Sequence, residues 1–206
     1  MTQKTDENNM ERKEKTFDEV YNERVASNQN AMERVNIVAE KLKSKYEEYD
    51  ATEAFVEYLS SIERIFSRSE KENWSVERTQ DEMIKGEIYI MSQTTGIDEE
   101  IFNSIYEEFK ATNNNVSKIQ EIANELMKKY EAVEDCFECE DCRKFIMYVK
   151  ESLLMFQKTL SGNSSFDELD EVKAASIKIK MNVMAKDGKP PVEILQNIYD
   201  DFMEGI

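Results

Sequence analysis

The chain has 206 residues, with 27 lysines and arginines against 44 aspartates and glutamates, and its formal net charge is -17. Such an acidic surface repels the phosphate backbone of DNA and RNA, which excludes direct nucleic-acid binding as the expected function. Hydrophobic residues make up 40% of the chain, with only 5 glycines and 2 prolines. This composition predicts an all-α protein of about eight long helices.

The first segment, residues 1–15, is polar and has no apolar run, so we expect a disordered leader there and no signal peptide. A helix is expected to begin at Thr16, whose hydroxyl can cap it while Glu19 reaches back in a capping box. Apolar side chains then follow a heptad spacing that only the polar Asn28 interrupts. They are Tyr21, Val25, Met32, Val35, Ala39, Leu42 and Tyr46.

A single apolar stripe of this length cannot bury itself, so the first helix needs a partner. The stripe can pack on another part of the same chain, which we expect. The alternative is a homodimer formed through the Tyr21–Tyr46 helix.

Two further helices complete the amino-terminal half. Asp50 and Glu53 repeat the capping-box pattern, and the apolar face that follows predicts a second long helix. Its short connection to the first helix predicts an antiparallel hairpin. Ser75 is expected to cap a third helix that reaches Met91. A short strand at residues 87–91 is the alternative for the end of that segment.

Five more helices are expected in the carboxy-terminal half, where turn residues separate apolar stretches with helical spacing. They cover about residues 98–111, 116–130, 133–160, 165–187 and 192–202. We expect an amino-terminal hairpin with the third helix (residues 16–95) and a carboxy-terminal helical bundle (residues 96–206). One continuous domain is an equally good description.

The densest run of negative charge lies between residues 131 and 141, where six acids occur without a base. They are Glu131, Glu134, Asp135, Glu138, Glu140 and Asp141. We interpret this acidic patch as the candidate surface for a basic partner protein. Smaller acidic groups at residues 98–100 and 167–171 fall in the first turns of expected helices, where the helix dipole favours carboxylates. Helix-end electrostatics therefore explains part of the acidic pattern without any function.

A basic stretch follows late in the chain, with Asp187 as the only acid within it. Its members are Lys173, Lys178, Lys180, Lys186 and Lys189. We expect these lysines to pair within the chain or to be solvated, with docking on an acidic surface as the alternative.

Three cysteines, Cys136, Cys139 and Cys142, form the only motif with chemical content. Thiolates at this spacing can bind zinc or an iron–sulfur cluster, but a tetrahedral zinc site needs a fourth donor, and the chain has no histidine or further cysteine. On a helix the three positions lead along one side toward Phe145, where thiols pack well as small apolar groups. We therefore expect core cysteines in a reducing compartment and no resident cofactor, with metal binding and redox chemistry as alternatives.

Catalysis is not expected. The absence of histidine excludes Ser-His and Cys-His triads and the Glu-x-x-His pairs of di-iron bundles. Magnesium held by carboxylates alone remains, as in all-α nucleotide pyrophosphohydrolases, which need two acid pairs one helical turn apart. The candidate pairs are Glu131 with Glu134, and Asp167 with Asp170 or Glu168 with Glu171.

The sequence thus predicts a cytoplasmic, non-enzymatic protein that binds a basic partner protein and inhibits or modulates it. A strongly negative surface attracts cationic surfaces and speeds association with them. The expected partners include nucleic-acid-binding enzymes and defence or transcription factors, as for phage-type regulators that mimic nucleic acid. A helical assembly factor or oligomeric scaffold is the second expectation. No membrane is expected as a partner, because no segment has enough continuous apolar sequence to span one.

Overall fold

The computed structural model describes residues 17–49, 51–131, 139–161, 169–187 and 190–206. Over these residues the chain forms eight α-helices and no strand, which confirms the all-α prediction. The helices are α1 (Phe17–Lys45), α2 (Thr52–Glu72), α3 (Val76–Thr95), α4 (Glu99–Lys110), α5 (Val116–Glu131), α6 (Cys139–Ser161), α7 (Leu169–Met184) and α8 (Val192–Gly205). A short 3₁₀ turn, η2 (Ala185–Asp187), follows α7. The predicted leader lies outside the described residues.

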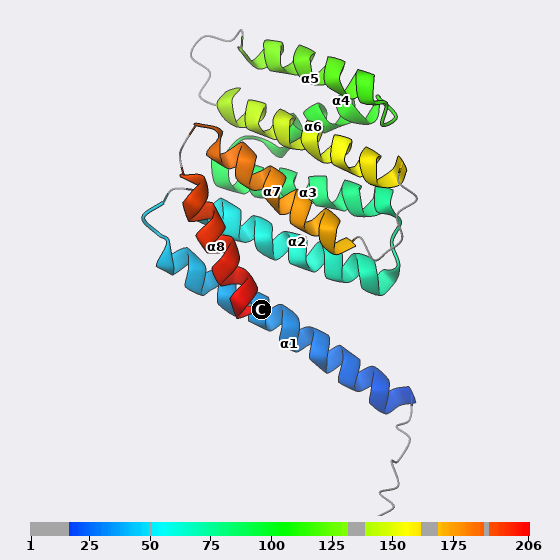
Figure 1. The fold of residues 1–206 in the computed structure, drawn as a ribbon, viewed down its shortest axis with the longest axis vertical. Helices are drawn as coiled ribbons and strands as arrows, with labels where there is room; N and C mark the ends of the chain where they lie inside the picture. Colours follow the sequence, from blue (N-terminus) through cyan, green and yellow to red (C-terminus); the bar gives the residue numbers. More distant parts are fainter. Residues whose placement is uncertain (1–16, 50, 132–138, 162–168, 188–189) are drawn as a thin grey trace, which may run out of the picture.

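The helices are stacked across the molecule, with α4 and α5 at one end and α1 at the other (Figure 1). α6 packs on α5, α3 and α7, and α2 packs on α1, α3, α7 and α8. The contacts between α3 and α6 and between α2 and α7 join the two halves of the chain, which share one hydrophobic core.

Aromatic side chains fill much of this core. The fully buried aromatics include Tyr58, Phe102, Phe145, Tyr148 and Phe202. The rings of Phe102 and Phe145 meet edge to face, with their centroids 5.0 Å apart, and so join α4 to α6. Such ring pairs add specific attraction to the burial of apolar area.

The start of α3 follows the predicted capping chemistry. The Ser75 hydroxyl accepts a hydrogen bond from the Arg78 N–H at 3.2 Å, which confirms the cap of α3. At the start of α2 the residue before the helix is Ala51, which makes no side-chain cap, and Asp50, on which the expected capping box depends, lies outside the described residues. Instead, the Thr52 hydroxyl donates to the carbonyl of Tyr46 at 2.7 Å, which holds the tight turn after α1.

Residues 87–91 are helical, so the alternative of a short strand there is wrong. α3 continues beyond Met91 to Thr95 and ends at Gly96, which has a left-handed φ of 73°. The Gly96 N–H bonds the carbonyl of Ser92 at 3.1 Å and so closes the helix. A glycine can adopt this conformation without the steric penalty that a side chain would bring.

Helix α1 packs on the bundle mainly through its second half. Val35, Ala39 and Leu42 are buried there, as the predicted apolar stripe requires, and Met32 and Tyr46 are partly buried against the core. Figure 1 shows the first half of α1 running past the end of α8 and away from α2. We call residues 17–29 the arm; the helical backbone of the arm is described, and its side chains are not.

The last turn of α8 is tied to the end of α1. The Asp201 carboxylate accepts hydrogen bonds from Lys45 Nζ at 2.5 Å and from the Tyr46 hydroxyl at 2.6 Å. These bonds, from Lys45 first and then from Tyr46, lower the pKa of Asp201. The tie keeps α8 on the half of α1 that packs against the bundle.

Replacing Asp201 with asparagine should therefore cause a small, pH-dependent loss of stability. Because the pKa of Asp201 is lower in the folded than in the unfolded chain, its stabilising contribution is present above about pH 4 and is lost as the pH falls through the lowered pKa. Urea unfolding should show a less stable Asp201→Asn variant at pH 7 and no difference near pH 2. Asp200→Asn, on the exposed neighbour, is the control, and a difference that persisted at pH 2 would contradict the assignment.

Candidate functional site

The described residues of the predicted acidic patch lie at one end of the α5–α6 pair. α5 ends at Glu131 and the described part of α6 begins at Cys139, and Figure 1 shows both ends on the same side of the molecule. Glu131 is exposed. Glu140 is also exposed and pairs with Lys144 at 2.7 Å. The other patch residues are Asp141, which lines a cavity described below, and Glu134, Asp135 and Glu138, which lie outside the described residues.

The structure describes two of the three cysteines, both buried at the start of α6. Cys139 is disulfide-bonded, and Cys142 is not part of a disulfide. A cysteine in a disulfide has no thiolate to give to a metal ion. Cys139 and Cys142 are thus buried, as expected of core residues, whereas the disulfide at Cys139 differs from the reduced thiol that was expected there. Cys136 lies outside the described residues.

The predicted magnesium pairs can be followed only in part. Glu134, Asp167 and Glu168 lie outside the described residues, and Asp170 and Glu171 are exposed in the first turn of α7. Within the ranges that the structure describes, no group of three or more Cys, Asp and Glu side chains is placed to hold a metal ion. The described helices also include none long and apolar enough to cross a bilayer.

The lysines of the basic stretch have different surroundings. Lys173 pairs with Glu63 of α2, and Lys180 pairs with Glu87 of α3. Lys178 is exposed, and so is Lys186, whose ammonium group lies 3.1 Å from the Met147 sulfur. Lys189 lies outside the described residues. Pairing within the chain is thus confirmed for Lys173 and Lys180.

The ion pair between Glu87 and Lys180 is the most unusual group in the described core. Glu87 is 1% exposed and Lys180 is 3% exposed, so both charges have left water almost completely. Removing a charged side chain from water costs several kcal/mol, which only a close partner of opposite sign can offset. Burial raises the pKa of Glu87, and Lys180 opposes that rise.

Two buried tyrosines complete the surroundings of Lys180. Its ammonium group lies 5.4 Å from the ring centre of Tyr58 and 5.9 Å from that of Tyr148. The Tyr58 hydroxyl is 3.1 Å from the Tyr148 hydroxyl and 3.1 Å from the carbonyl of Ser176. Because a carbonyl can only accept, Tyr58 donates to Ser176 and Tyr148 donates to Tyr58. The ammonium group thus faces two aromatic rings and one carboxylate, all fixed by packing.

A cavity of about 410 Å³ opens beside this ion pair, between the start of α2 and helices α3, α6 and α7. Its polar lining residues are Glu87, Lys180, Asp141, Lys144, Thr94 and Thr95. Its apolar lining residues are Ala51, Ala54, Met91, Val183 and Met184. Burial raises the pKa of Asp141 above its usual value, and Lys144 opposes that rise. The cavity therefore combines four ionisable side chains with an aliphatic wall.

The two oxygens of the Glu87 carboxylate have different surroundings. Oε1 accepts the bond from Lys180, whereas Oε2 is buried and has no hydrogen-bond partner among the described residues. A buried acceptor without a donor costs about 1–3 kcal/mol, and more when it carries charge. The attraction of the neighbouring Lys180 ammonium group offsets part of that cost.

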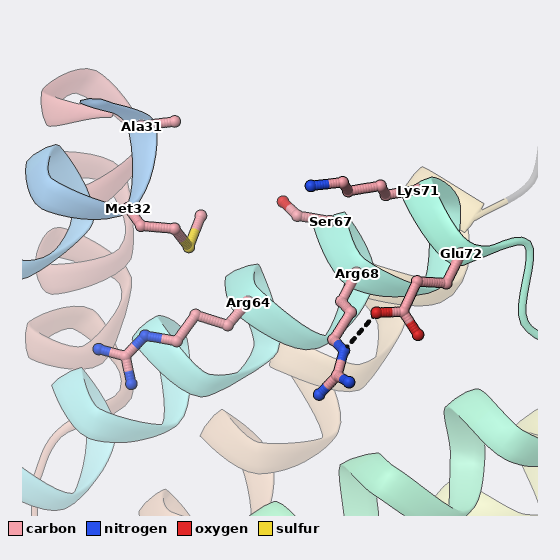
Figure 2. A pocket seen from close by; sticks show the side chains of 7 residues that line it. All are labelled: Ala31, Met32, Arg64, Ser67, Arg68, Lys71 and Glu72. Carbon is pink, nitrogen blue, oxygen red and sulfur yellow. Dashed lines mark hydrogen bonds and ion pairs between the residues drawn. The ribbon is translucent and has the colours of Figure 1, made fainter. Parts of the chain in front are cut away.

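A second hollow lies where α1 diverges from α2. This groove has a volume of about 360 Å³ (Figure 2). It is lined by Ala31 and Met32 from α1 and by Arg64, Ser67, Arg68, Lys71 and Glu72 from α2. Figure 2 shows the Met32 side chain pointing across the groove toward α2, and Arg68 turned to Glu72, with which it pairs at 2.7 Å. The groove is locally basic, in contrast to the net charge of the chain.

The sequence and the fold of the chain were compared with those of known proteins. The chain matches no family model, no curated protein and no solved structure.

Sequence reasoning missed the Glu87–Lys180 pair, although a signal for it exists. Glu87 occupies the same helical face as Met83, Ile84 and Ile88, all of them buried. A charged residue at a core position of an amphipathic helix indicates a buried partner of opposite charge. Lys180 likewise occupies a buried position of α7, next to the buried Met181.

Proposed function

We propose that the chain is a protein-binding module that holds a basic partner protein on the arm of α1 and on its carboxylate-rich exterior, and so modulates that partner. The observation that supports this most is the position of the arm, which extends beyond the bundle while the rest of α1 is packed (Figure 1). Isolated helices shorter than about 12–15 residues are only marginally stable in water, so docking would stabilise the arm.

The distribution of charge supports a basic partner. Many lysines are paired within the chain, as in Lys43 with Glu57, Lys85 with Asp81 and Lys173 with Glu63. Meanwhile α4 and α5 present carboxylates that are exposed and form no ion pair among the described residues. They are Glu99, Glu100, Glu108, Glu121 and Glu125. The surplus negative charge therefore lies on the outside, where it can attract a cationic surface and raise the association rate.

Deletion of the arm should weaken partner binding by at least about tenfold, which corresponds to 1.4 kcal/mol. The partner is first identified by co-purification and is then purified, and its affinity is measured by calorimetry for the full chain and for a chain lacking residues 1–29. A chain lacking only residues 1–16 is the matched control, because it keeps the arm. Equal affinity of the two truncated chains would contradict a role for the arm.

Salt should weaken the same complex. Raising the salt concentration from about 20 to 200 mM shortens the screening length and removes long-range attraction, so the association rate should fall several-fold. The triple variant Glu99→Gln, Glu100→Gln and Glu108→Gln should show a smaller fall. Binding that is indifferent to salt would contradict the electrostatic part of the proposal.

Self-association is the second candidate function, and the basic groove favours it. Arg64, Arg68 and Lys71 lie where α1 leaves α2, and the arm sequence contains Asp18, Glu19 and Glu23. A second copy could therefore bring an acidic helix to a basic groove, in keeping with the scaffold interpretation. Light scattering at micromolar concentration decides: a dimer that Lys71→Glu dissociates supports this candidate, and a monomer rules it out at that concentration.

A further inference from the structure

The α2 wall of the basic groove is a helix face that turns from buried to cationic where α1 leaves it. Val56 and Ser60, one turn apart on this face, are buried. The next positions along the same face are Arg64, Ser67 and Lys71, and all three are exposed. The part of α2 that α1 does not cover is therefore polar and positively charged.

The sequence of α2 keeps acids away from these cations. Residues three or four positions apart on a helix are neighbours. Within α2, such neighbours of Arg64 and Lys71 are only serines and Arg68. Lys43 and Lys85, by contrast, each have an acid at one of these spacings and pair with it. In a chain with 44 aspartates and glutamates, a cationic face without an acid beside it is unusual.

Both cations have donors to offer to a ligand. Lys71 makes no ion pair and no hydrogen bond with any described residue. Arg64 donates from one terminal nitrogen to the Asn36 side-chain oxygen at 2.7 Å and makes no ion pair with a described acid. A guanidinium and an ammonium group each carry several N–H donors, so both can still bind a carboxylate. Arg68 differs, because Glu72 neutralises it.

The positions of Arg64 and Lys71 set the spacing of the charges on the ligand. The two residues are seven positions apart on α2, which corresponds to about 10 Å along the helix axis. Figure 2 shows their charged ends in different parts of the groove. A single phosphate or carboxylate therefore cannot contact both, whereas a helix with acids seven positions apart repeats the spacing.

The α1 wall of the groove adds an apolar requirement. It is formed by Ala31 and Met32, both of them partly exposed, and Figure 2 shows Met32 reaching toward α2. The flexible thioether of methionine adapts to apolar groups of different shapes. The best complement to the groove is therefore a helix that has two acids seven positions apart and an apolar turn between them.

We propose that the groove binds an acidic amphipathic helix of a partner protein, with its carboxylates on Arg64 and Lys71 and its apolar side chains on Ala31 and Met32. A partner with a basic surface can carry such a helix as well. The inference rests on the proposed function only in that the ligand is a protein. Its test leaves the arm intact, so either proposal can fail without the other.

The arm of a second copy fits the groove less well. The acids of the arm sequence are Asp18, Glu19 and Glu23, which span less than two helical turns. None of them is seven positions from another, so a second arm can neutralise Arg64 or Lys71 but not both.

The test uses the full chain, labelled with ¹⁵N, and a synthetic alanine-rich helical peptide of about sixteen residues. The peptide carries two glutamates seven positions apart and leucines on the turn between them. At millimolar concentration it should cause saturable shifts of the backbone amide signals of Met32, Ser67 and Lys71. The same peptide with glutamines in place of the glutamates should bind about fivefold more weakly, because exposed ion pairs contribute modestly.

The net charge of the protein makes the sign of this difference diagnostic. A chain with a net charge of -17 repels an acidic peptide at long range. Glutamates in the peptide should therefore weaken its binding everywhere except at a basic site. A gain in affinity from the glutamates locates the contact at cations.

Variants of the chain place this contact at the groove. The double variant Arg64→Gln and Lys71→Gln should bind the glutamate peptide about fivefold more weakly than the parent chain does. It should bind the glutamine peptide as the parent chain does. The matched control is Lys118→Gln with Lys178→Gln, which makes the same change in net charge at exposed positions of α5 and α7. The control should keep the affinity of the parent chain to within about twofold, because distant charges are screened.

Four results would overturn the proposal. In the first, the glutamine peptide binds as tightly as the glutamate peptide. In the second, the groove variant binds as tightly as its matched control. In the third, a peptide of residues 17–30 of this chain shifts the groove amides at lower concentration than the glutamate peptide does, which makes a second copy the occupant. In the fourth, no peptide shifts the groove amides.

Discussion

Replacing Lys180 with methionine is expected to destabilise the protein by about 3–5 kcal/mol, because the Glu87 carboxylate would stay buried without its counter-ion. Both side chains are almost inaccessible to water, and the ammonium group also lies 5.4 Å and 5.9 Å from the ring centres of Tyr58 and Tyr148. Neither ring can neutralise a carboxylate. Urea unfolding followed by circular dichroism at pH 7 measures the loss.

The stability lost in the Lys180→Met variant should depend on pH. Without Lys180, the pKa of the buried Glu87 rises further, so the folded variant binds a proton that the unfolded chain releases at the same pH. The loss relative to the parent chain should therefore be largest at pH 7 and above, and should shrink as the pH falls toward 5. A loss that grew on acidification would contradict the buried position of the carboxylate.

Two controls separate the buried pair from a general effect of losing a lysine. Lys178→Met, on an exposed position of the same helix, should change the free energy of unfolding by less than about 0.5 kcal/mol. The double variant Glu87→Met and Lys180→Met should recover most of the lost stability, since an apolar pair of similar volume needs no counter-ion. A double variant as unstable as Lys180→Met would show that lost packing, and not the unpaired charge of Glu87, causes the loss of stability.

Replacing Phe102 with alanine should lower the free energy of unfolding by about 3–5 kcal/mol, through lost burial and the cavity left behind. The ring is 0% exposed and meets Phe145 edge to face at 5.0 Å, so it fastens α4 to α6. The same urea unfolding experiment measures the effect. Ser104→Ala, on the exposed face of α4, is the control and should be close to neutral.

The consequence for α4 and α5 makes the prediction more specific. These two helices form one end of the stack, and they contact the rest of the core mainly through α6 and α3 (Figure 1). Hydrogen exchange of Phe102→Ala should therefore accelerate in α4 and α5 before it does in α2 or α7. Uniform acceleration across all helices would mean that the two helices do not open as a separate unit.

The helices were predictable because their signals are local. Ser75 caps α3 as its side chain and position suggest, and the buried stripe of Val35, Ala39 and Leu42 follows from spacing alone. The start of α2 was not predictable in the same way, because the Thr52 hydroxyl bonds back to the carbonyl of Tyr46 and the residue before the helix, Ala51, has no side chain that can cap it.

The buried Glu87–Lys180 ion pair could not be predicted from the sequence for a different reason. Glu87 and Lys180 are 93 positions apart, and nothing local shows that α3 and α7 bring them together. Asp141 illustrates the same limit: in sequence it belongs to an acidic run, but in the fold it turns to a cavity beside two lysines. Charge density along a chain predicts a charged surface only where the helices leave those side chains in water.

Hydrogen–deuterium exchange of α1, in the free protein and with its purified partner, tests the central claim of a partner-binding arm most directly. The account predicts fast exchange for amides 17–29 and slow exchange for the packed amides 35–42 in the free chain. With the partner bound, amides 17–29 should become protected while the packed half of α1 stays unchanged. Arm amides that exchange at the same rate with and without the partner would contradict the account.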